Sequence, residues 1–151
     1  MPTLEEARIH DAITRAEMAK MISVYAQVIM QQQPNSDKLL QCSVFNDRNK
    51  VNKELQMFII QACQLGLMGY QANGIAVQTS FRPNDTITRA EIGIILSRLL
   101  RGNLHAGDEI NRYQTHLQAL KNAEIIKLTD NPMMIELRGN IFIMLQRMSL
   151  M

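Results

Sequence analysis

The sequence predicts an all-α protein of three helix-loop-helix repeats that pack together. The first observation is a recurring tetrapeptide. Thr-Arg-Ala-Glu stands at 14–17 and again at 88–91, and a weaker copy, Leu-Arg-Gly-Asn, stands at 137–140. The second is that apolar residues recur three and four positions apart after each copy, which indicates amphipathic helices. Helical hairpins of this kind bury their apolar faces only by packing on one another, so we expect three of them to associate.

The apolar spacing places these helices in order along the chain. We expect a short helix around residues 4–9, then helices that start at 14, about 53, 88, about 113 and about 137. Polar segments and Gly- or Pro-containing turns end them, at 31–37, 66, 102–108 and 131–132. In the irregular segment 70–85, the spacing of Ile75, Val77 and Phe81 is compatible with a short strand pair.

Length and composition favour one globular domain over residues 1–151. Repeat 1 covers about 3–33, repeat 2 about 42–102 and repeat 3 about 109–150. With 46% hydrophobic and 20% charged residues, the chain can bury a core. A net charge of +2 and scattered basic residues argue against nucleic-acid binding, and the short apolar runs argue against membrane insertion. The acidic residues 1–6 lack the apolar core of a signal peptide.

The motif itself matches a helix-capping box. The Thr14 and Thr88 side chains are placed to accept from a helix-start N–H, while Glu17 and Glu91 reach back to the cap. In the third copy Asn140 stands in the place of the glutamate.

The motif arginine needs a different explanation. Arg15, Arg89 and Arg138 each fall in a first helical turn, where the helix dipole disfavours a cation by a few tenths to about 1 kcal/mol. An anion should therefore face them. It is either a carboxylate of the protein, for which Asp11 and Asp85 are candidates and a neighbouring repeat could supply another, or a ligand carboxylate or phosphate held with free helix-start N–H groups.

Cys42 and Cys63 are the two cysteines, and they are either buried thiols or, in an exported protein, a disulfide. The histidines are too scattered for a zinc site, and the chain lacks the sequence motifs of common hydrolases and nucleotide-binding enzymes. We therefore expect no metal, no cofactor and no enzymatic activity.

The repeat resembles the S-layer homology domain, a three-repeat module of bacterial surface proteins. The resemblance rests on Phe-Asn-Asp at 45–47, Leu-Gly-Leu-Met at 65–68, and Phe-Arg-Pro-Asn at 81–84 leading into Ile-Thr-Arg-Ala-Glu at 87–91. It implies an all-helical, pseudo-threefold arrangement, with grooves between the repeats that bind an anionic, often pyruvylated, cell-wall polysaccharide. Arg15 and Arg89 match the family's groove arginine directly, and Arg138 matches it within the degenerate third copy.

These observations together predict a non-catalytic domain that anchors its parent protein at the cell surface. Its partner would be a cell-wall polysaccharide, and its location extracellular, with any export signal removed or carried elsewhere on the parent protein. The alternative is a protein-interaction module in a surface array, because the same helical body could serve for subunit contacts.

Overall fold

The fold is helical throughout the part of the chain that the computed structural model describes, residues 8–107, 112–127 and 131–151. Six α-helices lie within these ranges: α2 (Arg15–Val28), α3 (Leu39–Cys42), α4 (Lys53–Gln64), α5 (Arg89–Arg101), α6 (Gln114–Asn122) and α7 (Arg138–Ser149). Two short 3₁₀ turns, Ser36–Lys38 and Arg48–Lys50, flank α3. The all-α prediction is confirmed. The helix expected around residues 4–9 lies almost wholly outside the described residues.

The recurring motif starts α2 and α5 as expected. Thr14 accepts from the Glu17 N–H and Thr88 from the Glu91 N–H, and each glutamate accepts in return from the cap N–H. The third copy differs, because Leu137 at the start of α7 offers no side-chain cap.

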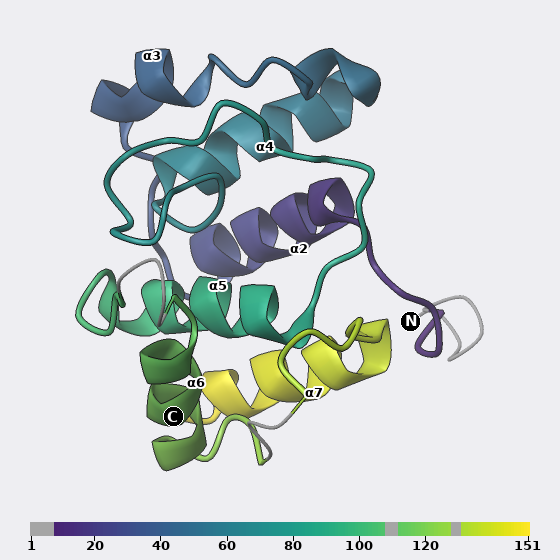
Figure 1. Cartoon of the computed structure of the whole chain (residues 1–151), viewed down its shortest axis with the longest axis vertical. Coiled ribbons are helices and arrows are strands. Elements are labelled where there is room, and N and C mark those ends of the chain that lie inside the picture. Colours follow the sequence, from purple (N-terminus) through teal and green to yellow (C-terminus); the bar gives the residue numbers. More distant parts are fainter. Residues whose placement is uncertain (1–7, 108–111, 128–130) are drawn as a thin grey trace.

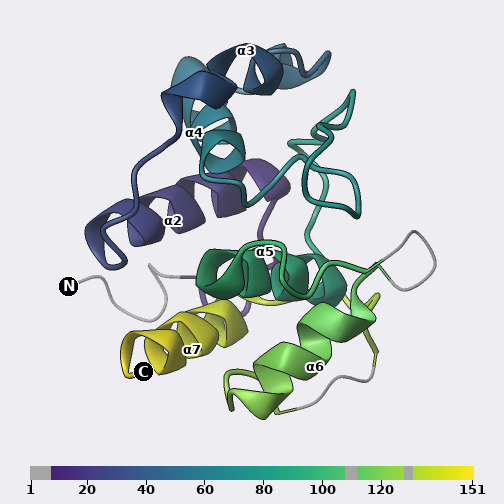
Figure 2. The same cartoon turned by 90° about the vertical axis from the view of Figure 1, so that its left-hand side faces the viewer.

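The helices stack in one body around a continuous core. Figures 1 and 2 show α2 and α5 near the middle, with α4 and α3 beyond α2, and α6 and α7 beyond α5. The closest helix pairs are α2 with α4 and α5 with α6. Each of these pairs joins a motif helix to the helix that opens the next repeat.

One of these pairs depends on a glycine. Gly93 of α5 lies so close to α6 that a Cβ at this position would overlap the Leu117 side chain. The absence of a side chain therefore sets the distance between α5 and α6.

The motif segments also contact one another through their backbones. The first helical N–H of each motif donates to the carbonyl four residues before another motif's arginine. These bonds are Arg15 N to Asp85 O (2.8 Å), Arg89 N to Met134 O (2.9 Å) and Arg138 N to Asp11 O (3.0 Å). The next N–H makes the same kind of bond: Ala16 N to Pro83 O (3.0 Å), Ala90 N to Pro132 O (2.8 Å) and Gly139 N to Ile9 O (2.9 Å). The contacts run from the first motif to the second, from the second to the third, and from the third back to the first.

Two details differ from the sequence analysis. The expected strand pair is reduced to one antiparallel bridge between Tyr70 and Val77, because the chain turns tightly at Asn73, whose side chain accepts from two following N–H groups. Val28 and Ile29 continue the three- and four-residue apolar spacing that predicts the buried face of α2, but they are more than half exposed. None of the helices described is long and apolar enough to cross a membrane.

Candidate functional site: arginine-lined clefts

Arg15 is held inside the protein rather than presented to solvent. Only 6% of the residue is exposed. Its Nε donates to the Phe81 carbonyl (2.8 Å), its guanidinium lies 5.2 Å from the centre of the Phe81 ring, and its Nη1 pairs with the Glu91 carboxylate. Burial lowers the pKa of Arg15, an effect that Glu91 opposes. Glu91 belongs to the second motif, so this ion pair joins two repeats.

The other two motif arginines make equivalent pairs. Arg138 of the third motif pairs with Glu17 of the first. Arg89 of the second pairs with Glu136, which immediately precedes the third motif, at 3.1 Å between Nε and Oε2. Glu17 keeps a lowered pKa although burial raises it, because Thr14 and Arg138 donate to its carboxylate. The three pairs follow the same cyclic order as the backbone contacts.

These contacts decide between the alternatives that the sequence left open for the anion beside each arginine. The anion that faces each motif arginine is a carboxylate of the protein, supplied by another repeat. Asp11 and Asp85 pair instead with Arg8 and Arg82. The helix-start N–H groups that were expected to receive a ligand already donate to backbone carbonyls or to the capping threonines.

Glu136 was missed by sequence reasoning. It is fully buried and stands two residues before Arg138, at the position that Ile13 and Ile87 occupy relative to the motif arginines of the other repeats. Its Oε1 accepts from the Leu137 N–H (3.2 Å) and from Asn140 Nδ2 (2.8 Å). Glu136 thus forms the ion pair with a motif arginine that the glutamate replaced by Asn140 would otherwise form. The signal was available, because the same repeat loses one glutamate and gains another.

A cleft nevertheless opens beside each of the three ion pairs. The largest charge imbalance lies in the one beside Arg15 and Glu91, which we call the arginine cleft, with a volume of about 490 Å³. Its described charged residues are Arg15, Arg82, Arg98, Arg112 and Glu91. Four arginines against one glutamate leave a surplus of three positive charges.

Two of these arginines are neutralised and two are not. Glu91 accepts from both Arg15 and Arg82, and Arg82 also lies 3.6 Å from Asp85. Arg98 and Arg112 form no ion pair with any acid in the described ranges. Because Asp85 lies outside the lining and compensates one of the three surplus charges, the two that remain among the described residues belong to Arg98 and Arg112.

Arg98 is the more unusual of the two because only 6% of it is exposed. It donates to the Gln71 carbonyl (3.1 Å) and lies 5.8 Å from the centre of the Tyr70 ring. Its Nε is buried and has no hydrogen-bond partner among the described residues. Burial, together with the charge of Arg112, lowers the pKa of Arg98 to about 10.

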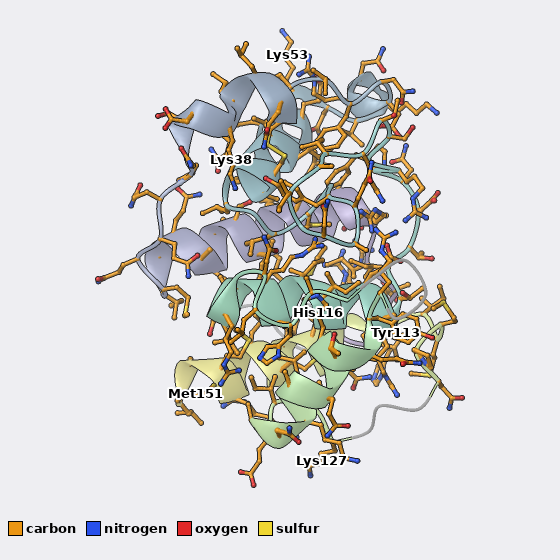
Figure 3. The ribbon with its side chains drawn as sticks, turned by 60° about the vertical axis from the view of Figure 1, so that its left-hand side comes forward. Lys38, Lys53, Tyr113, His116, Lys127 and Met151 are labelled. Carbon is orange, nitrogen blue, oxygen red and sulfur yellow. A yellow bond between two sulfur atoms is a disulfide. The ribbon has the colours of Figure 1, made fainter. Side chains whose placement is uncertain are left out.

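Tyr70 forms the wall on which both cations rest. The residue is 2% exposed, its hydroxyl donates to the Cys63 carbonyl, and its own carbonyl accepts from Arg112 (3.1 Å). Cys63 is joined to Cys42 by a disulfide, drawn in Figure 3 as a yellow bond near Lys38. Tyr70 is thus hydrogen-bonded to the end of α4, which the disulfide joins to α3. Tyr113, at the start of α6, adds a second aromatic ring to the lining.

The remaining two clefts have less to offer an anion. The cleft beside Arg138 and Glu17 contains Lys20 and Glu54, which pair with each other, so its described charges balance. The cleft beside Arg89 and Glu136 has a volume of about 190 Å³, below the range of about 300–1,000 Å³ that is usual for ligand sites.

Arg82, Arg98 and Arg112 were not among the residues predicted from sequence. For Arg98 a signal existed: it follows Ile95 by three positions and so falls on the apolar face of its helix. Comparison of the sequence with models of known protein families and with curated proteins found no match.

Proposed function

We propose that this protein is a non-catalytic surface domain that binds an anionic polysaccharide of the cell wall in the arginine cleft. The observation that carries the proposal is the cleft's uncompensated charge, four arginines to one glutamate, beside two tyrosines. Acidic sugars supply the missing negative charge, and the partly exposed ring of Tyr113 offers a flat surface on which a sugar ring could pack. Anchoring of the parent protein to the envelope follows from such binding.

The proposal includes a pseudo-threefold arrangement of repeats like that of the S-layer homology domain. It is supported by backbone bonds that recur at equal offsets from Arg15, Arg89 and Arg138, and by ion pairs that follow the same cyclic order. In this arrangement the motif arginines close the ring of repeats. Ligand binding falls to residues that the motif does not contain.

An extracellular location is part of the same proposal. Disulfides persist mainly in oxidising compartments, and Cys42 and Cys63 are joined by one. The sugar, in turn, is expected on the outer face of the wall, where such a domain would meet it.

A second candidate function is assembly with other proteins of a surface array. It is favoured by a run of apolar residues around the third motif that remain at least 36% exposed: Met133, Met134, Ile135, Leu137, Phe142 and Ile143. Exposed apolar clusters mark contact surfaces in many proteins. Binding through this apolar surface would not require a charged partner.

Retention on cell-wall sacculi separates the two functions. The domain is mixed with purified sacculi before and after removal of their attached polysaccharide, and the bound fraction is measured at low and high salt. We expect retention that requires the polysaccharide and weakens as salt rises, because exposed charge interactions are screened. Equal retention on stripped sacculi would refute glycan binding.

A further inference from the structure

We propose that Arg98 and Arg112 form a subsite for one compact oxyanion, the carboxylate or phosphate group of an acidic sugar. The proposal rests on the proposed glycan function for the sugar part of the ligand, but the oxyanion follows from the cleft itself. It also separates this subsite from the motif arginines, which the sequence had pointed to.

The first argument is the cost of leaving Arg98 as it stands. Removing a charged group from water costs several kcal/mol after relaxation, and buried charges in proteins are normally paired for that reason. Arg98 lies near the carboxyl end of α5, where the helix dipole favours a cation, but that effect is only about 0.3–1 kcal/mol. The Gln71 carbonyl and the Tyr70 ring do not neutralise the charge of Arg98. An anion bound in the cleft would neutralise it.

The second argument is that Arg98 and Arg112 act against each other while the cleft holds no anion. The charge of Arg112 lowers the pKa of Arg98, so the two guanidinium groups are close enough to repel. Both are fixed on Tyr70, Arg112 through the carbonyl and Arg98 through the ring. Two cations held on one rigid wall are preorganised to share a single oxyanion, as arginine forks commonly do.

The third argument excludes the other two arginines of the cleft. Arg15 and Arg82 both donate to Glu91, and a ligand anion near them would be repelled by that carboxylate. Arg98 and Arg112 have no such competitor among the described residues. The oxyanion is therefore directed to the end of the cleft at Tyr70.

A distinctive consequence concerns stability. Since Arg98 is a buried cation that pairs with no acid in the described ranges, replacing it with an apolar side chain of similar length should leave the free protein as stable as before, or more stable. Gln71 is exposed, so its carbonyl can be hydrated once the arginine is gone. If Arg98 serves binding rather than folding, its replacement should therefore reduce binding without reducing stability.

The test measures melting temperature with three probes at constant ionic strength: glucuronate, glucose 6-phosphate and glucose. The variants are Arg98→Met, Arg112→Met and, as a matched control on the same helix, Arg101→Met, an exposed arginine outside the cleft lining. We expect at least one acidic sugar, but not glucose, to raise the melting temperature of the wild type and of Arg101→Met. A response to both acidic sugars or to one of them shows which oxyanion the subsite takes.

We expect the apparent Kd to rise at least tenfold in Arg98→Met and in Arg112→Met, since a hydrogen bond to a charged group contributes about 1.5–3 kcal/mol. A wild-type response in the two cleft variants, or an equal response to glucose, would overturn the subsite. So would a wild type that ignores both acidic sugars while the sacculi retain it through their polysaccharide, although the glycan function would then stand. Arg98-dependent binding of an acidic sugar without retention on sacculi would support the subsite and refute the anchoring role.

Discussion

Glu136 occupies a core position that isoleucine fills in the other two repeats, and it is fully buried there. It is tolerated because its carboxylate has partners on several sides: Arg89, the Leu137 N–H and Asn140. In the other repeats a glutamate three residues after the cap makes the equivalent ion pair. The third repeat has thus moved the carboxylate by four positions and kept its contact.

The moved carboxylate predicts that a second substitution can rescue the loss of Glu136. Glu136→Ile alone should lower the free energy of unfolding by about 3–5 kcal/mol, because it leaves a largely buried arginine without this carboxylate. Adding Asn140→Glu restores the pattern of the first two repeats and should recover most of that loss. Denaturant unfolding of the two single variants and the double variant forms the cycle that measures the coupling. Equal stability of Glu136→Ile and the wild type would show that the ion pair does not join the repeats.

The residues also show where sequence reasoning stops. The caps of α2 and α5 were predictable because a capping box is complete within four residues. The partners of Arg15, Arg89 and Arg138 were not, since each lies 47 or more positions away in the sequence. Position in the first helical turn correctly indicated that each arginine needs an anion, but it could not say whose.

At the scale of helices, the pairing of α5 with α6 contains a buried hydrogen bond. His116 Nδ1 lies 2.6 Å from Ser97 Oγ, and His116 Nε2 is buried without a partner in the part of the chain that the structure describes. Burial lowers the pKa of His116 to about 4, and the charges of Arg98 and His105 act in the same direction. The histidine is therefore neutral in the folded protein near neutral pH.

A pH dependence of folding follows from that shift. Below its ordinary pKa of 6.5 the histidine binds a proton in the unfolded chain but not in the folded one, until the pH approaches 4. The contribution of neutral His116 to the free energy of unfolding is therefore complete above pH 6.5. It decreases as the pH falls, by about 2 kcal/mol at pH 5. Unfolding of the wild type and of His116→Gln at pH 7.5 and pH 5.0 measures it. A His116→Gln variant with the same pH dependence would place the effect elsewhere.

Helix positions were largely predictable, and the elements between them were not. Amphipathic spacing located α2, α4, α5, α6 and α7, because each buries one face on a neighbour. It missed α3 and the two 3₁₀ turns, which are too short to show a period. It also misplaced Val28 and Ile29, which are exposed, whereas the small residues Ala19 and Ala26 of α2 are fully buried and are overlooked by a search for large apolar residues.

At the scale of the whole molecule, the arginines discussed above fall into two sets with different surroundings. The motif arginines pair with carboxylates in or next to other copies of the motif, so we expect them to stabilise the fold. Arg98 and Arg112 line the arginine cleft and pair with no described acid. In the proposed function, binding and folding can therefore be changed separately, which the motif alone would not reveal.

The most direct test of this division is retention of Arg98→Met on polysaccharide-bearing sacculi, beside its melting temperature. We predict that the variant melts at or above the temperature of the wild type and loses most of its retention, while Arg101→Met keeps both properties. A variant that melts normally and is retained like the wild type would contradict the account, because the cleft's unpaired charge would then have no part in binding.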